Sequence, residues 1–393
     1  MSSKSPVCFT QKVDVLELLR DGRARTRAEL VAESGLSRST VGARVDALLG
    51  HGLVVVAGEA SSSGGRPPAR VVFNPTARLV VAVDVGATHV TVALTDLSGL
   101  VVDVVTLDLA VAAGPDVVLG AILREARRMV AAAGRRPAEV VGVGVGVPGP
   151  VEHATGRPVS PPIMPGWDGF DVPAAVQRVF DVPVLVDNDV NLLALAEQHA
   201  AWPDVTELVF VKVSTGIGAG ILAGGQLQRG ASGSAGDLGH LRVPWVPDSP
   251  RPADDPRDLE AVASGPAIAE RLRGLGLEAR TSADVVALVR GGDQRVHAAV
   301  RQAGRDLGAV LSGVVNLLNP SVIVVGGSIS RASEHLIAGV REVVYGQSIP
   351  LATHDLRIVR SRTDHTAGVL GAALLVTRQV FAEDPLPHLI RSG

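Results

Sequence analysis

The chain has 393 residues, of which 46% are hydrophobic and 20% are charged, with a formal net charge of −3. This length exceeds one hydrophobic core and predicts two or three domains, and the composition excludes a largely disordered protein. No apolar run reaches the roughly 18–20 residues of a membrane-spanning helix without an interrupting Gly, Pro or charge. The first residues lack an apolar signal segment, and Cys8 is the only cysteine, which excludes intrachain disulfides and multi-cysteine metal sites. We therefore expect a cytoplasmic protein with no membrane partner.

The charges are distributed unevenly along the chain. Residues 1–75 hold ten Lys or Arg against seven Asp or Glu, whereas the remaining residues hold 27 against 33. A head of about +3 therefore precedes a body of about −6, a pattern that fits contact with nucleic acid at one end only.

The N-terminal segment predicts three helices followed by a hairpin. A first apolar pattern over 13–19 stops at Gly22. Thr26 is the predicted N-cap of a second helix, with Glu29 completing a capping box, and this helix ends near Gly35. Ser37 then caps a third helix over 37–52, and two short strands around a flexible loop follow over 53–73.

Two helices joined by a glycine turn, with polar residues opening the second, form the arrangement that enters a DNA major groove. Arg side chains can read guanine edges there, and Ser and Thr can hold phosphates. Arg66, flanked by glycines and prolines, suits a narrow minor groove. A helical protein–protein module with a solvated hairpin is the alternative interpretation. The predicted DNA contacts are Ser37, Arg38, Ser39, Thr40, Arg44 and Arg66.

From Leu79 onward the pattern is α/β. Two strands surround a Gly-Ala-Thr turn over 79–99, a third strand follows, and 116–133 has the apolar spacing of a helix. Residues 207–230 repeat the strand–glycine turn–strand design about 130 residues later, which predicts a duplicated two-lobed fold with a cleft between the lobes.

Short motifs in this region occur in an order that resembles the ROK family, whose name stands for repressors, open reading frames and kinases. The motifs lie at 84–88, 147–149, 165–167, 187–191, 215–220, 230–240, 259–264 and 319–327. The resemblance covers nearly the whole chain, including the winged helix of the repressor members. It implies an α/β fold in which a winged helix-turn-helix precedes a two-lobed actin- and hexokinase-like (ribonuclease H-like) core. The implied domains are 1–75, then 76–189 with 366–384, then 190–365.

The resemblance also implies a site. Asp189 corresponds to the carboxylate that accepts the proton of a sugar hydroxyl in a kinase. For Asp189 and Asp187, capping of the following helix is the alternative, and for His240 it is an ordinary structural role. The implied sugar-binding residues are Asn188, Asp189, Asp237, His240 and Glu260. The implied nucleotide-binding residues, weak or vestigial, are Asp84, Gly86, Thr88, Thr215, Gly216, Gly218, Gly326 and Gly327.

The chain departs from the family pattern at several positions. Residues 243–258 contain no cysteine where relatives bind structural zinc together with the counterpart of His240, so we expect no zinc. Ala87 replaces a glycine at the first phosphate hairpin, where a methyl group crowds an approaching phosphate. Asp237 replaces a longer Glu, and 161–164 lacks an asparagine found in sugar-phosphorylating relatives. Together these changes predict a pocket that binds sugar but phosphorylates it poorly or not at all.

The leading hypothesis is a sugar-responsive transcriptional regulator, expected to be a repressor, in which sugar binding between the lobes alters operator affinity. Its partners are operator DNA, a small sugar effector and further copies of the chain in a homodimer or homotetramer, and no cofactor is expected. One alternative is an active hexose or N-acetylhexosamine kinase that uses ATP and Mg²⁺. The other is a DNA-binding regulator whose pocket has become a scaffold without an effector.

Overall fold

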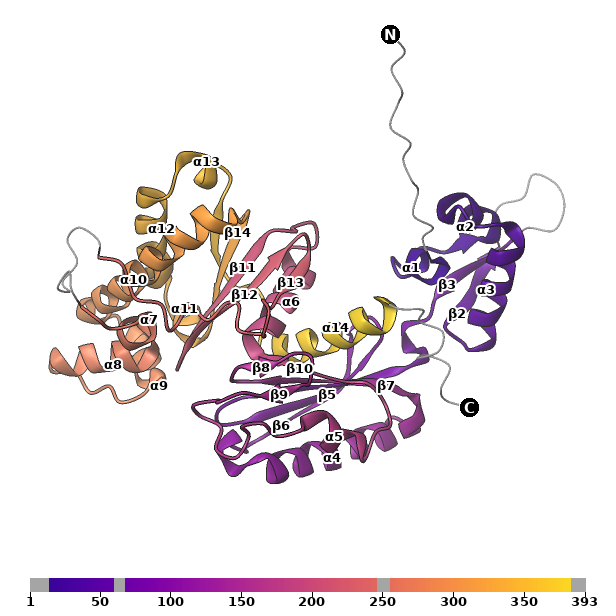
Figure 1. Cartoon of the computed structure of the whole chain (residues 1–393), viewed down its shortest axis with the longest axis horizontal. Coiled ribbons are helices and arrows are strands. Elements are labelled where there is room, and N and C mark those ends of the chain that lie inside the picture. Colours follow the sequence, from indigo (N-terminus) through magenta and orange to yellow (C-terminus); the bar gives the residue numbers. More distant parts are fainter. Residues whose placement is uncertain (1–13, 60–67, 246–254, 383–393) are drawn as a thin grey trace, which may run out of the picture.

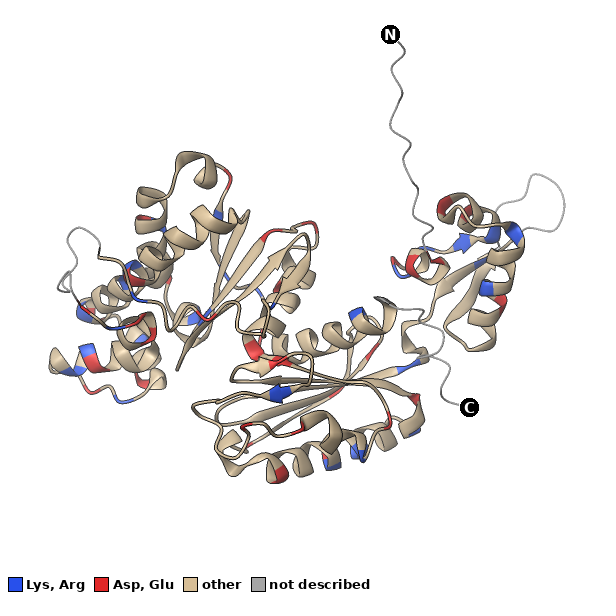
Figure 2. Cartoon of the chain, viewed as in Figure 1, with Lys and Arg blue, Asp and Glu red and all other residues tan. Residues whose placement is uncertain are grey.

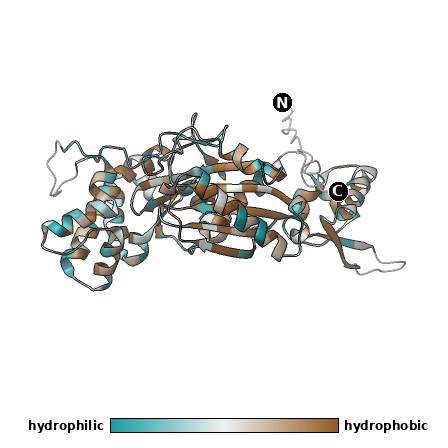
Figure 3. Ribbon diagram, turned by 90° about the horizontal axis from the view of Figure 1, so that it is seen from below, coloured by the Kyte–Doolittle hydropathy of each residue, from teal (hydrophilic) through white to brown (hydrophobic). Residues whose placement is uncertain are grey.

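The computed structural model describes residues 14–59, 68–245 and 255–382, which form a small N-terminal module and two larger α/β lobes (Figure 1). The described strands make one three-stranded sheet, two five-stranded sheets and one two-stranded ribbon. In Figure 3 the strands of the core are mostly hydrophobic, and hydrophilic residues gather on loops and outer helices. No helix in the described ranges is long and apolar enough to span a membrane.

The N-terminal module consists of a helix-turn-helix and an adjoining hairpin. Thr26 and Glu29 form both hydrogen bonds of the predicted capping box, Gly35 takes a left-handed φ of 68°, and the Ser37 hydroxyl accepts from the Thr40 N–H. These local predictions are confirmed. The short strand at 25–26 was not predicted, because two residues carry no periodicity. The elements are α1 (Val15–Leu19), β1 (Arg25–Thr26), α2 (Arg27–Ser34), α3 (Arg38–Gly50), β2 (Val54–Glu59) and β3 (Ala69–Phe73).

The first lobe is built on a sheet in which an antiparallel meander continues into two parallel strands. Its strands are β4 (Leu79–Val85), β5 (Val90–Asp96), β6 (Val101–Leu107), β7 (Val140–Val147) and β10 (Val184–Asn188). Their spatial order is β10-β7-β4-β5-β6. Alternate β4 side chains enter two different cores, so the sheet is covered on both faces. The helices and short elements here are η1 (Pro75–Ala77), η2 (Val111–Ala113), α4 (Pro115–Ala132), η3 (Pro137–Glu139), β8 (Val151–Glu152), β9 (Arg157–Pro158) and α5 (Val172–Gln177).

The second lobe repeats the topology of the first. Its strands are β11 (Leu208–Val213), β12 (Ile217–Ala223), β13 (Gln226–Gln228), β14 (Val322–Gly326) and β15 (Arg357–Arg360). Their order, β13-β12-β11-β14-β15, again places an antiparallel meander beside two parallel strands, so the predicted duplication is confirmed.

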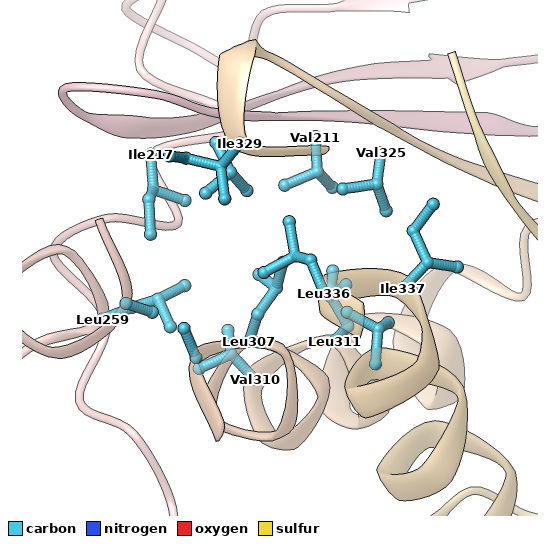
Figure 4. Packing of buried hydrophobic residues seen from close by; sticks show 14 of the residues in the cluster. Val211, Ile217, Leu259, Leu307, Val310, Leu311, Val325, Ile329, Leu336 and Ile337 are labelled. Atoms are coloured by element: carbon cyan, nitrogen blue, oxygen red, sulfur yellow. The ribbon is translucent and has the colours of Figure 1, made fainter. Parts of the chain in front are cut away.

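One face of the second sheet carries a helical layer. The helices after the meander are α7 (Leu259–Ala263), α8 (Gly265–Gly274), α9 (Ser282–Arg290), α10 (Gln294–Leu318), α11 (Ser328–Ala332), α12 (Glu334–Gln347) and α13 (Pro350–Thr353). Leu307 and Leu311 of α10 and Leu336 of α12 pack toward Val211 and Val325 of the sheet (Figure 4). This apolar layer buries one face of the second sheet.

Two helices lie between the sheets: α6 (Asp189–Ala201) against the second sheet and α14 (Ala367–Ala382) against the first. Glycines allow these close contacts. A Cβ at Gly144 would lie 2.2 Å from the Ala372 carbonyl oxygen, and one at Gly220 would lie 2.6 Å from the Ala194 Cβ. The helices also contact each other, and a Cβ at Gly371 would lie 2.0 Å from the Leu192 oxygen.

The far end of α14 lies beside the N-terminal module (Figure 1). The Phe381 ring makes an edge contact with Phe73, with centroids 6.1 Å apart, and the Arg20 guanidinium lies 4.2 Å from the same ring centroid. Arg135 adds hydrogen bonds to the carbonyl oxygens of Thr76 and Ala77, in the connection to β4. The module therefore packs on the first lobe through α14 and the start of the core.

Candidate functional site

The strand β10 ends in a polar cluster at the start of α6, as predicted. Asn188 caps the helix, because its Oδ1 accepts from the Val190 N–H at 2.9 Å. Its Nδ2 donates to the Gly149 carbonyl oxygen at 3.0 Å, which ties the cap to the loop after β7. The capping role considered for Asp187 and Asp189 thus belongs to Asn188.

Asp187 is buried and fully engaged within the protein. Its carboxylate accepts from the Asn188 N–H, from Asn191 Nδ2 at 2.7 Å and from Arg229 Nε at 2.7 Å. Arg229 follows β13 in the second lobe, so this ion pair joins the two lobes. The motif comparison did not identify Arg229, which lies one residue before the signature that begins at Gly230.

Asp189 is almost completely buried and pairs with a lysine that the sequence analysis missed. Lys212 Nζ lies 2.5 Å from Asp189 Oδ2. Burial acts to lower the pKa of Lys212, but the carboxylates of Asp189 and Asp84 outweigh burial, so this pKa is raised. The available signal was a single cation in the otherwise apolar strand Leu208–Val213, because unpaired lysines are almost never buried.

Asp84 stands near the end of β4, next to the first glycine hairpin. Burial, with the negative charge of Asp189, raises the pKa of Asp84 to about 6, while the positive charges of Lys212 and His89 oppose the shift. Gly86 closes the turn by donating its N–H to the His89 carbonyl oxygen at 2.8 Å. Thr88 is exposed at the tip, and its hydroxyl lies 3.2 Å from His89 Nδ1.

The second hairpin and the glycines Gly326 and Gly327 at the end of β14 lie at one end of the second sheet, because β11 and β14 are parallel neighbours. Gly327 has a φ of 95°, and a Cβ there would lie 2.1 Å from the Val213 oxygen. The Ser214 and Ser328 hydroxyls are 3.3 Å apart. The structure thus brings together one predicted nucleotide set, which comprises Thr215, Gly216, Gly218, Gly326 and Gly327.

The remaining predicted sugar-binding residues are engaged in different ways. Glu260 accepts from the Ile217 N–H at 2.9 Å and lies against Gly216, so it supports the second hairpin. His240 Nδ1 lies 2.8 Å from Asp237 Oδ1, and this hydrogen bond raises the pKa of the exposed His240. No hydrogen bond or ion pair among the described residues joins the Asp237–His240 pair to Asp189.

The predicted absence of zinc stays a prediction. Residues 246–254, in the middle of the segment concerned, lie outside the described residues. Within the described ranges, no group of three or more His, Cys, Asp or Glu side chains is placed to hold a metal ion.

The start of α3 presents a small polar surface on the N-terminal module. Arg38 and Ser39 are exposed, and no described residue forms an ion pair with Arg38. The Ser37 hydroxyl bonds with those of Ser39 and Thr40 at 2.9 and 2.8 Å, which orders the three hydroxyls as a group. Arg44 forms an ion pair with Asp14, the N-cap of α1, and its predicted DNA contact stays a prediction. Arg66 lies outside the described residues.

Other arginines of the module are also paired, which explains its mixed appearance in Figure 2. The pairs are Arg20–Glu17, Arg25–Asp21, Arg25–Glu33, Arg27–Asp46 and Arg70–Glu29. Most of the described arginines of the module are therefore engaged in internal salt bridges, whereas Arg38, at the start of α3, is exposed.

Comparison with known proteins places this arrangement in a family. The model of the ROK family matches residues 80–379. The chain belongs to the ROK family. It is 27% identical over 385 residues to the xylose repressor of Caldicellulosiruptor bescii, and the match covers 94% of this chain and 96% of that protein.

A solved structure described as a ROK family transcriptional regulator, homologue of the E. coli MLC protein, matches with a TM-score of 0.81 and 27% identity. This match covers 96% of our chain and 98% of the chain in the solved structure. The glucokinase of Halalkalibacterium halodurans is also 27% identical, but that match covers 77% of this chain and 96% of the kinase. The two proteins named for regulation therefore match a larger part of this ROK chain than the kinase does.

Proposed function

We propose that this protein is a sugar-responsive DNA-binding transcriptional regulator, a repressor, in which sugar binding between the lobes changes operator affinity. The observation that carries the proposal is the helix-turn-helix module packed onto a core of the sugar-kinase type. Relatives named as xylose repressors and as an N-acetylglucosamine repressor match 93–94% of the chain, including most of that module.

The start of α3 supports the DNA side of the proposal. Arg38 is free among the described residues to contact a base edge or a phosphate, and Ser39 and Thr40 lie beside the first N–H groups of a 13-residue helix. Such a helix end attracts phosphate, because its N–H groups and dipole are positive. Arg44 is a weaker candidate than the sequence indicated, because its ion pair with Asp14 would have to break.

The polar residues around α6 support the sugar side. Sugar hydroxyls both donate and accept, so they suit a site in which carboxylates and an ammonium group lie together. Asp189 and Lys212 provide this pair, and Asp237 with His240 forms a second, exposed pair in the second lobe. Asp189 also keeps the kinase alternative open, since it would be the base toward a sugar hydroxyl, with ATP and Mg²⁺ as cofactors.

Helix α14 supplies a physical connection between the two activities. Near its start, Gly368 lies against Asp84, where a Cβ would be 2.1 Å from Oδ2, and near its end Phe381 contacts Phe73. A ligand that changes the angle between the lobes would move this helix and the module together. Operators with two half-sites require two modules, so the acting form is a homodimer or homotetramer.

The test is fluorescence anisotropy of the purified chain on its own upstream DNA, at fixed salt, with xylose, glucose and N-acetylglucosamine. We expect one sugar to change DNA affinity at least tenfold, or roughly 1.4 kcal/mol. Arg38→Ala should weaken DNA binding about fivefold or more, and its salt dependence should fall by about one charge. Arg127→Ala, an exposed arginine on α4, is the matched control and should bind DNA normally.

Three outcomes would replace the proposal. A chain that does not bind DNA is not a regulator of this kind. DNA binding that no sugar changes favours the scaffold alternative. Sugar-dependent ATP turnover that disappears in Asp189→Asn favours the kinase.

A further inference from the structure

Matching positions in the two lobes carry opposite charges. Asp84 is the next-to-last residue of β4 and pairs with Gly146 of the parallel strand β7. Lys212 is the next-to-last residue of β11 and pairs with Gly326 of the parallel strand β14. Because the two sheets share one strand order, these two residues occupy equivalent places in the duplicated fold.

Asp189 interacts with both of them. The Lys212 ammonium lies 2.5 Å from its carboxylate, and the negative charge of Asp189 acts on Asp84 as well. Two carboxylates that repel each other in this way create a place for a cation. In this chain the cation is covalently attached, and its stem leaves a strand whose other side chains are apolar and buried.

The neighbours of Lys212 in the sheet leave its head group room. On one side β12 presents Gly218, and on the other β14 presents Gly326, so neither flanking strand adds a side chain. An ammonium group has three N–H donors, and Asp189 uses one of them. The Lys212 side chain as a whole is 29% exposed, so it is not sealed from solvent, and no second hydrogen bond of its ammonium to a described residue is seen.

We propose that Lys212 is the resident cation of this site: its ammonium takes the place that a divalent metal would occupy between Asp84 and Asp189. The site then binds its ligand without metal and without nucleotide. The free N–H donors of Lys212 bind a hydroxyl of an uncharged sugar, a ligand class that rests on the proposed function.

The same contact works against phosphoryl transfer. That reaction needs a divalent metal to neutralise the phosphates and a carboxylate free to receive the hydroxyl proton. Lys212 repels a metal ion by its charge and occupies one oxygen of Asp189, and Arg331 adds a second positive charge nearby. The site residues of this chain therefore fit Mg²⁺ and ATP poorly, for a reason that a glycine motif cannot reveal.

Metal binding by the whole chain tests the proposal directly, with Mn²⁺ as the probe and electron paramagnetic resonance as the readout. We expect no detectable Mn²⁺ binding at this site in the wild-type chain. Lys212→Met should bind Mn²⁺ at least tenfold more tightly than the weakest affinity that the wild-type titration could detect. Lys212→Arg keeps the charge and should behave as wild type. Adding Asp84→Asn to Lys212→Met should abolish the new site, which separates it from acidic surface patches.

Other results would overturn the proposal. These are wild-type Mn²⁺ binding that Asp84→Asn removes, or a folded Lys212→Met chain with no gain in Mn²⁺ binding. Inorganic phosphate that binds the wild type but not Lys212→Met would instead make Lys212 an anion site. If Lys212→Met does not fold, Lys212→Gln, which also removes the positive charge, takes its place with the same expected gain in Mn²⁺ binding. None of these readouts uses sugar or DNA, so failure here is distinct from failure of the regulator proposal.

Discussion

The two lobes share one backbone plan and differ in the chemistry placed on it. In each, an antiparallel meander leads into two parallel strands, and a glycine turn follows the first strand. At the matching position the first lobe carries Asp84 and the second carries Lys212. A duplicated fold can therefore determine where two functional side chains lie, while the identity of single residues determines whether the site between them attracts a metal ion or excludes it.

In both lobes a helix packs closely against the sheet. Substitutions at these helix–sheet contacts are expected to have the largest effect on stability. Gly144 of β7 allows α14 to approach the first sheet, and Gly220 of β12 allows α6 to approach the second. A methyl group at Gly144 would meet the Ala372 carbonyl oxygen at 2.2 Å, and this backbone atom cannot rotate away.

We expect Gly144→Ala to destabilise the chain by about 3 kcal/mol or more, and Gly220→Ala to do so comparably. Urea unfolding measures both. Gly313→Ala is the control, because this exposed helical glycine has no atom within 4 Å of the added Cβ, and alanine should stabilise it by about 0.5–1 kcal/mol. A neutral Gly144→Ala would mean that α14 is not held tightly on the first sheet.

A smaller effect is the dependence of folding stability on pH that Asp84 causes. The pKa of Asp84 in the folded chain is about 6, above the ordinary value of 3.8, so the native state binds this proton more tightly than the unfolded state. Its stabilising contribution is complete below about pH 4 and is lost as the pH rises through 6, by at most about 3 kcal/mol.

Asp84→Asn should therefore remove a fall in stability between about pH 4 and 7 that the wild-type chain shows in chemical denaturation. Asp355→Asn, at a carboxylate that is 92% exposed, is the control and should keep the wild-type profile. If the stability of wild type and of Asp84→Asn depended on pH in the same way, the pKa of Asp84 would not be raised in the folded chain.

The sequence predicted the features whose signals are local. The capping box at Thr26 and Glu29, the cap at Ser37 and the repeated glycine hairpins each lie within a few residues, so periodicity and turn chemistry reveal them. Contacts between distant residues were missed. Arg44 pairs with Asp14, 30 positions earlier, and Lys212 meets Asp189, 23 positions earlier, only after the chain has folded.

The smallest expected effect concerns α14, the helix that packs on the first sheet and also contacts the N-terminal module. Phe381, near the end of α14, contacts both Phe73 and Arg20. Phe381→Ala should leave operator affinity within about twofold, because the α3 surface is untouched, but should reduce a tenfold sugar effect to below about threefold, a loss of about 0.7 kcal/mol or more of the roughly 1.4 kcal/mol of coupling. Phe381→Leu keeps an apolar contact and should retain most of the response.

Anisotropy titrations with and without sugar measure both operator affinity and the sugar effect on the same sample. If Phe381→Ala responds to sugar as the wild type does, the signal leaves the core by another route, and the contact of α14 with the module is only structural.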